Sequence, residues 1–220
     1  MRNKLLRFAE NDQRNNIIQP GKENFETIKG NWAKHFQNNN PITVELGCGR
    51  GEYTVGLARK HPDRNFIGVD IKGARIYYGS STAIEEGLDN VAFLRTKILE
   101  IDKYFAPEEV DEIWMTFPDP RPRDRDEKRR MTHPRYLKMY QQILKDGGWF
   151  HLKTDATPFF DFALESLSSV SHTDLEYTHD LYKHSMLEEH GGLQTRYERK
   201  FLAEGKKINY LKCRIRKEED

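Results

Sequence analysis

Residues 42–51 read ITVELGCGRG, and this stretch indicates the fold. An apolar, β-branched run ends in glycines at 47, 49 and 51, and a helical pattern follows over residues 51–60. Glycines allow a backbone to approach a ligand closely and to turn into a helix N-terminus. A dinucleotide-binding fold carries G-x-G-x-x-G, whereas here the third glycine comes one residue early. Glu45, two residues before the first glycine, would repel a pyrophosphate, so the stretch favours a ligand that carries positive charge.

Short apolar runs alternate with helical patterns along most of the chain. Strands are predicted at 42–46, 65–70, 91–94, 112–117, 149–153, 175–179 and 209–215, and helices at 51–60, 74–86, 133–144 and 158–169. The sequence Asp146-Gly147-Gly148 is a stop signal for the third helix, and residues 182–199 are predicted to form a loop with weak helical character. Strand–helix alternation implies right-handed crossovers and a parallel sheet covered on both faces. We therefore expect a Rossmann-like α/β fold with its ligand crevice outside the carboxyl ends of the strands.

Composition limits the class of protein. The length of 220 residues fits one domain, residues 31–220, preceded by a basic arm, residues 1–30, that is expected to fold or dock on binding a partner. Cys48 and Cys213 are the only cysteines, which excludes a disulfide framework and favours a reducing cytoplasm. The chain lacks an apolar run of the roughly 18–20 residues that a membrane span needs.

Charge is balanced overall but unevenly distributed. The chain has 36 Lys and Arg against 35 Asp and Glu. Residues 121–138 contain eight basic residues against three acidic ones, and residues 199–217 contain eight against one. The two blocks either form separate solvated faces or come together as one surface for nucleic acid.

The fourth predicted strand ends in a proline-rich segment. Residues 117–123 read FPDPRPR, with prolines at alternate positions that stiffen an extended chain and fix the direction of Asp119. A rigid carboxylate at the carboxyl end of a strand is well placed for recognition or catalysis. The alternative is a proline-rich turn that only leads into the next helix.

The glycine loop together with a strand-ending acid resembles the class I S-adenosylmethionine-dependent methyltransferases. This resemblance implies that Glu45, Gly47 and Gly49 lie at the methionine end of the cofactor and Asp70 at its ribose, although Asp70 could also be a helix cap. It further implies that Thr96 and Lys97, after the third strand, contribute to the adenine pocket. Many relatives carry an acid there that accepts from the adenine amino group; this chain lacks that acid, so a backbone group is expected to make the contact.

Three further motifs narrow the resemblance. The sequence FPDPRPR…EKRRMTHP is similar to the F-x-D-P-W-P-K…K-R-R signature of bacterial tRNA (guanine-N7)-methyltransferases (the TrmB family). FHLKTD at 150–155 resembles that family's F-K-T-D, and TRYE at 195–198 its T-x-Y-E. The departures are Arg121 for the usual Trp and Arg123 for the usual Lys. The resemblance implies a mostly parallel seven-stranded sheet with helices on both faces and an antiparallel last strand.

The family's functional positions are carried over to the matching residues. Asp119 takes the catalytic position and is also expected to contact the cofactor. Positions that contact guanine or tRNA are taken by Arg123, Asp155, Thr195, Arg196, Tyr197 and Glu198, and phosphate contacts are expected from Lys128, Arg129 and Arg130. Structural alternatives remain for some of them. Asp155 could cap the helix near residue 158, and Thr195 with Glu198 fits a capping box. The run 128–130 could be a solvated helix start, but positive charge there would oppose the macrodipole.

The chemistry implied needs neither a general base nor a metal. Guanine N7 carries an in-plane lone pair, so the enzyme has to align N7, methyl carbon and sulfur. Asp119 is expected to accept hydrogen bonds from the guanine N1–H and amino group, which become more acidic as N7 is methylated. The base must be exposed or flipped into the site. Arg2, Lys4, Arg7 and the two basic blocks would hold tRNA phosphates.

Three other functions compete with this interpretation. A nicotinamide-dependent oxidoreductase is opposed by the glycine spacing and by Glu45. A non-catalytic RNA-binding module on the same fold is opposed by the presence of both halves of the site. Methylation of a protein or small molecule is opposed weakly, by the basic blocks. The eight histidines do not form the i, i+4 pair with an intervening acid that is typical of zinc proteases. The protein is expected to be a monomer or homodimer.

Overall fold

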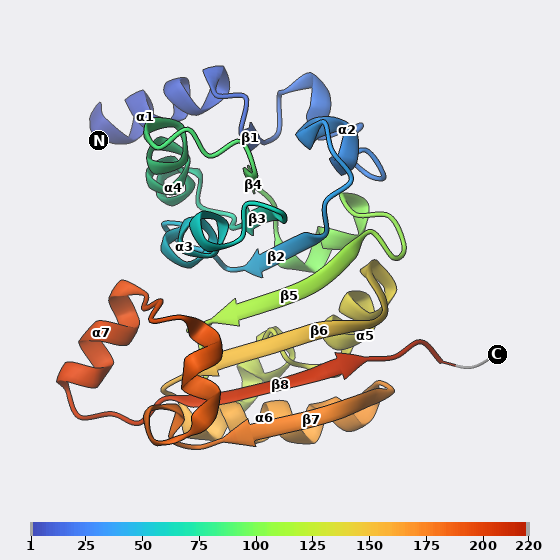
Figure 1. The fold of residues 1–220 in the computed structure, drawn as a ribbon, viewed down its shortest axis with the longest axis vertical. Helices are drawn as coiled ribbons and strands as arrows, with labels where there is room; N and C mark the ends of the chain where they lie inside the picture. Colours follow the sequence, from blue (N-terminus) through green and yellow to red (C-terminus); the bar gives the residue numbers. More distant parts are fainter. Residues whose placement is uncertain (1, 219–220) are drawn as a thin grey trace.

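The computed structural model describes residues 2–218, with side chains from residue 5 onward. Within this range the strands form one sheet in the order β1-β4-β3-β2-β5-β6-β8-β7 (Figure 1). The strands are β1 (Ile17–Ile18), β2 (Ile42–Leu46), β3 (Asn65–Val69), β4 (Val91–Leu94), β5 (Val110–Thr116), β6 (Leu144–Thr154), β7 (His172–Thr178) and β8 (Asn209–Ile215). Strand β8 pairs antiparallel with both of its neighbours, β6 and β7, and the other neighbouring strands among them pair parallel. The expected mostly parallel α/β fold with an antiparallel last strand is confirmed.

The sheet differs from expectation in two strands. It has eight strands in the described range instead of seven, because β1 from the N-terminal segment pairs parallel with β4. Strand β6 begins at Leu144, so Asp146-Gly147-Gly148 lies inside the strand instead of ahead of it. The register between β5 and β6 shifts between Val110 and Glu112, which accommodates the additional residues of this glycine segment.

Seven α-helices are present in the described residues. They are α1 (Arg2–Gln13), α2 (Trp32–Phe36), α3 (Glu52–Lys60), α4 (Gly73–Glu85), α5 (Pro134–Ile143), α6 (Thr157–Ser166) and α7 (Arg196–Ala203). The four predicted helices correspond to α3, α4, α5 and α6. Helix α7 starts within the segment expected to be a loop, and short 3₁₀ turns at Leu181–Lys183 and Ser185–His190 occupy much of the rest. None of the helices in this range is long and apolar enough to cross a membrane.

The two faces of the sheet differ in chemistry. One face buries an apolar core, to which α2, α5 and α6 contribute Trp32, Tyr140 and Phe160. The other face is apolar under α3 and α4, but between β2 and β8 it carries polar and aromatic side chains. These are Thr43, Glu45, Glu112, Trp114, Thr116, His151, Lys153 and Tyr210, which alternate along their strands with residues of the apolar core. This polar layer lies beneath the elements that frame the pocket described below.

The N-terminal segment packs along α4 (Figure 1). Asn11 donates a hydrogen bond to the carbonyl of Gly73, and Arg14 donates one to the carbonyl of Tyr77, each at 2.9 Å. The Arg7 guanidinium lies 4.8 Å from the centroid of the Tyr78 ring, within cation–π range. Arg7 therefore faces α4, whereas the side chains of Arg2 and Lys4 lie outside the described residues.

Candidate active site

A pocket of about 450 Å³ opens at the carboxyl ends of β2, β5 and β6. Segments far apart in sequence line it: the glycine loop at 47–50, the start of α3, residues 116–120, residues 155–156 and the start of α7. It thereby brings together seven of the predicted site residues, namely Gly47, Gly49, Asp119, Asp155, Thr195, Arg196 and Tyr197. This position matches the crevice expected for a sheet of this topology.

Other predicted residues lie outside the pocket lining, and some lining residues were not predicted. Within the described part of the chain, the pocket is not lined by Glu45, Asp70, Thr96, Lys97, Arg123, Lys128, Arg129, Arg130 or Glu198. The lining residues that sequence reasoning missed include Arg50, Glu52, Tyr53, Lys72, Arg75, Phe201 and Lys206. Arg50, Glu52, Tyr53, Lys72 and Arg75 lie in loops after strands or in the first turns of the following helices, whereas Phe201 lies within α7 and Lys206 in the loop before β8.

The glycine loop has a backbone that only glycine adopts easily. Gly51, which precedes α3, has a φ of +72°. A Cβ on Gly51 would lie 2.6 Å from Cε1 of Phe93, closer than side-chain atoms pack. The loop is therefore fixed by its conformation and by the close approach of a buried ring.

Glu45 lies below this loop and is almost completely buried. Its carboxylate accepts a hydrogen bond from the Thr54 backbone N–H at 2.9 Å, another from the Thr54 hydroxyl, and a third from the Thr116 hydroxyl at 2.7 Å. Burial raises the pKa of Glu45 from 4.5 to about 7, against the opposing effect of these hydrogen bonds. The carboxylate thus connects β2 to α3 and β5, with a charge that a nearby cation would stabilise.

Asp70 follows β3 and connects it to the glycine loop. One carboxylate oxygen accepts from the Gly49 backbone N–H at 3.0 Å, and the other accepts from the Lys72 backbone N–H at 2.8 Å. The second bond is the cap-like contact that was the structural alternative for this residue. Each oxygen of a carboxylate has a further acceptor site, so these contacts leave capacity for a hydroxyl ligand.

Thr96 and Lys97 follow β4 away from the pocket lining. Thr96 is buried, and the exposed Lys97 is paired with Glu100 at 3.5 Å. Lys97 does not supply the acceptor that an adenine amino group would need, because an ammonium is only a donor, and the Thr96 hydroxyl, which can accept, is buried away from the pocket lining.

Asp119 is the exposed carboxylate of the pocket. It lies between Pro118 and Pro120 at the end of β5, with 62% of its side chain exposed. Arg121 engages both of its oxygens: the Arg121 backbone N–H donates to Oδ1 at 3.2 Å, and Nε lies 3.1 Å from Oδ2. Arg121 has a φ of +46°, a strained value for a residue with a side chain. The arginine that replaces the family's usual Trp is therefore paired with Asp119 itself.

Asp155 does not cap the following helix. Its Oδ2 forms an ion pair with Nζ of Lys206 at 2.8 Å, while the Thr154 hydroxyl accepts from the backbone N–H of Ala156. Asp155 therefore pairs with Lys206 across the pocket wall and does not act as a helix cap.

The start of α7 forms the opposite wall, and here the capping alternative is present. The Thr195 hydroxyl accepts from the Glu198 backbone N–H at 3.1 Å, and the Glu198 carboxylate accepts from the Thr195 N–H at 3.3 Å. Thr195, Arg196 and Tyr197 line the pocket, whereas the side chain of Glu198 is fully buried beneath them. A direct contact from Glu198 to a substrate would require its burial to be broken.

The predicted phosphate-contacting residues lie on the segment that follows the pocket-lining residues 116–120. Lys128 and Arg129 are in the last turn of a 3₁₀ helix, Asp124–Arg129, whose first turn is acidic. The structural alternative, a helix start at 128–130, is not found: Lys128 and Arg129 end a helix, and α5 starts later, at Pro134. Arg123 and Arg129 are exposed and both pair with Asp126, whereas Arg130 packs over the ring of Phe162 at 4.5 Å.

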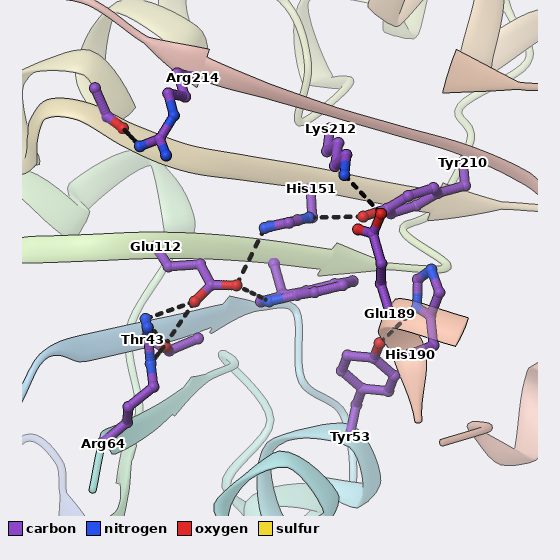
Figure 2. Close-up of polar contacts among 12 residues, drawn as sticks. Thr43, Tyr53, Arg64, Glu112, His151, Glu189, His190, Tyr210, Lys212 and Arg214 are labelled. Carbon is purple, nitrogen blue, oxygen red and sulfur yellow. Dashed lines mark hydrogen bonds and ion pairs between the residues drawn. The ribbon is translucent and has the colours of Figure 1, made fainter. Parts of the chain in front are cut away.

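The polar layer continues away from the pocket in several groups of contacts, of which the largest surrounds Glu112 and His151 (Figure 2). His151 bonds to the Tyr210 hydroxyl through Nδ1 at 2.8 Å and lies 3.1 Å from Glu112 through Nε2. The indole of Trp114 stacks on His151 with ring centroids 4.0 Å apart. Burial would raise the pKa of Glu112, but its bonds with His151 and the charge of Arg64 lower it to about 2. Figure 2 also shows Tyr53, from α3, bonded to His190 at 2.9 Å.

Metal ligands are not clustered here. Among the described residues, no group of three or more His, Cys, Asp or Glu side chains is arranged to hold a metal ion.

The architecture and the position of the pocket are those of a class I methyltransferase. The solved structure of the 16S rRNA methyltransferase KamB superposes with a TM-score of 0.64, covering 86% of this chain and 94% of that one, at 16% sequence identity. At this level of identity the likeness shows the fold alone.

Sequence comparison then gives the family. Residues 39–211 match the family described as "Putative methyltransferase". The chain is 48% identical to the tRNA (guanine-N(7)-)-methyltransferase of Cytophaga hutchinsonii over 96% of both chains. It is equally similar to the enzyme of that name from Christiangramia forsetii, over 98% of this chain and 99% of that one. The protein belongs to the tRNA (guanine-N(7)-)-methyltransferase family.

Proposed function

We propose that this protein transfers the methyl group of S-adenosylmethionine to N7 of a guanine in the variable loop of tRNA, releasing S-adenosylhomocysteine. One observation carries the proposal beyond family membership. The glycine loop at 47–49 and the family's substrate-side residues, Asp119, Asp155 and Thr195–Tyr197, line one pocket although they come from four separate segments. Cofactor and base could thus meet in the same cavity.

The residues present fit the cofactor. Pockets of about 300–1,000 Å³ hold ligands of drug size, and this one has about 450 Å³. Gly47 and Gly49 allow close backbone approach, and Asp70 retains acceptor capacity for ribose hydroxyls. Burial raises the pKa of Glu45 to about 7, and a cationic ligand nearby would lower this pKa again by favouring the charged carboxylate. S-adenosylmethionine supplies such a cation in its sulfonium, and with it the electrophilic methyl group.

Asp119 is the residue that we expect to hold the guanine. Its carboxylate is already bound to two donors on Arg121, which shows that it can accept from a pair of N–H groups. In the complex, the N1–H and amino group of guanine would take the place of these donors. As N7 gains the methyl group, the purine becomes cationic, and a fixed carboxylate stabilises the charge that develops. Because N7 already has a lone pair, Asp119 does not have to remove a proton.

Exposed basic residues near the pocket would bind the tRNA backbone. Arg123, Lys128 and Arg129 are exposed on the segment that follows the pocket-lining residues 116–120, and Lys206 lines the pocket. Arg216 and Lys217, at the end of the 199–217 block, lie instead at the other end of the sheet, against Asp146 and Gln141. Phosphate contacts of this kind give affinity that falls as salt rises.

The cysteines, Cys48 and Cys213, are both free and buried, which supports a cytoplasmic location for the enzyme.

The test is transfer of labelled methyl groups to tRNA that lacks the modification, followed by chemical cleavage of the RNA at 7-methylguanine. The proposal predicts one cleavage site, in the variable loop, that disappears when the target guanine is replaced by adenine. Methylation elsewhere would show a class I methyltransferase with another substrate. Binding of tRNA and cofactor without transfer would instead indicate a non-catalytic RNA-binding protein.

A further inference from the structure

A buried lysine lies beneath the pocket wall that α7 forms. Nζ of Lys153, on β6, is 2.7 Å from the Glu198 carboxylate, on α7, and both side chains are 0% exposed. Glu198 also accepts a hydrogen bond from the Tyr182 hydroxyl at 2.9 Å and takes part in the capping box of α7. An ion pair fully removed from water therefore joins the sheet to the first turn of the helix.

Lys153 lies between the two elements that frame the pocket. Its ammonium is 5.4 Å from the centroid of the Tyr53 ring, at the start of α3, and it faces Glu198 at the start of α7. Besides the two tyrosines, Tyr53 and Tyr182, a titratable group near it is His190, which is kept neutral: burial, followed by the charge of Lys153, lowers the pKa of that imidazole to about 2. Glu198 is thus the partner that balances the lysine's charge.

Such a pair is a poor means of gaining stability. Removing two charges from water costs as much as their attraction returns, and apolar replacements of buried pairs are often as stable as the originals. The pair does impose geometry, because any displacement of α7 would leave a charge unpaired in an apolar surrounding. The backbone N–H of Arg196 adds a second tie, since it donates to Glu52 on α3 at 2.7 Å.

We propose that Lys153 is a positioning residue: through its buried pair with Glu198 it holds Thr195–Tyr197 in place as a pre-formed wall of the substrate pocket. Glu198 then acts beneath the substrate instead of touching it. The kinetic part of this inference rests on the proposed function, whereas its structural part does not. A pre-formed wall lowers the ordering cost of binding and improves alignment of the base.

The test uses Lys153→Met with Glu198→Gln in one protein. This variant removes both charges while preserving side-chain shape: the glutamine carbonyl can still accept from the Thr195 N–H, and its amide nitrogen can donate to the Tyr182 hydroxyl, which reverses that hydrogen bond. The proposal predicts a melting temperature at or above that of the wild type, at least tenfold faster hydrogen exchange of the amides of residues 196–201, and a KM for tRNA raised at least fivefold. The Kd for S-adenosylmethionine should stay within twofold. A pair that only stabilises the fold would lower the melting temperature and leave the KM of the folded protein unchanged, which would overturn the proposal.

The matched control removes another lysine–acid pair of β6, far from the pocket. Lys145 and Asp111 are 2.6 Å apart and partly exposed, so Lys145→Met with Asp111→Asn should leave exchange in α7 and the KM at their wild-type values. If the Lys153/Glu198 variant does not fold, exchange of the wild type decides: fast exchange of the 196–198 amides in the free protein would refute a pre-formed wall. If wild-type protein does not methylate tRNA, the proposed function fails, and the exchange comparison still tests the role of Lys153.

Discussion

Replacing Glu45 by glutamine should remove a specific pH dependence from the stability of the protein. The carboxyl group is buried, and its pKa in the folded protein is about 7, against 4.5 for the free side chain. The folded protein therefore holds a proton between these two values that the unfolded chain has released. The stability that Glu45 contributes is fully present below pH 4.5 and is lost as the pH rises through about 7.

The size of the effect follows from the shift. A difference of roughly 2.5 pH units at 1.36 kcal/mol per unit is about 3 kcal/mol. Relative to Glu45→Gln, the wild type should lose about this amount of unfolding free energy between pH 4.5 and pH 8. Glutamine has the same shape, and its carbonyl can still accept from the Thr54 N–H.

Urea unfolding of both proteins at half-unit steps from pH 5 to pH 8 measures the difference directly. The unfolding free energy of the wild type, relative to that of the variant, should be highest at the acidic end of this range and should fall toward pH 8. A difference that stays constant over this range would refute the assignment of a raised pKa to Glu45. Saturating S-adenosylmethionine should reduce the difference at pH 8, because a nearby cation favours the carboxylate.

Three further predictions concern the pocket and the residues near it. Asp119→Ala should lower kcat by about 10²–10³-fold, as loss of a charge-stabilising group does, with cofactor affinity by calorimetry unchanged; near-wild-type turnover would contradict its role. Gly51→Ala should destabilise the protein by about 2–4 kcal/mol in urea unfolding, because the residue has a positive φ and an added Cβ would collide with Phe93. The control is Gly87→Ala: its φ is also positive, but open space surrounds the added Cβ, so the variant should cost only about 1 kcal/mol. Equal losses would show that the contact with Phe93 is unimportant. Lys128→Ala should reduce the slope of log affinity for tRNA against log salt by about 1, and an unchanged slope would place it off the RNA.

The fold could be predicted where a local pattern sufficed. The run ITVELGCGRG predicts β2, the loop and α3, because alternating apolar residues and a glycine with positive φ determine the structure of neighbouring residues directly. The strand β1 could not be predicted in this way, since it is two residues long and exists only through its pairing with β4. Helix α7 was missed as well: its eight residues are strongly polar and begin at a capping box that was recognised only as an alternative.

Site residues could be predicted where they directly follow strands. Asp155 directly follows β6, and Asp119 lies three residues after the end of β5, so topology alone brings them to one edge of the sheet. The burial of Glu198 could not be predicted, because it depends on Lys153, 45 positions earlier in the chain. Lys206 was missed for the same reason, since only the tertiary fold brings it to Asp155.

The most direct test of the central claim uses tRNA in which the target guanine is replaced by 7-deazaguanine. This base keeps the N1–H and amino group that Asp119 is expected to bind, but it has carbon in place of N7. We predict that this tRNA binds with an affinity within a few-fold of that of unmodified tRNA, inhibits the reaction competitively, and accepts no methyl group. Transfer of labelled methyl to the 7-deazaguanine tRNA at the normal rate would contradict methylation at N7.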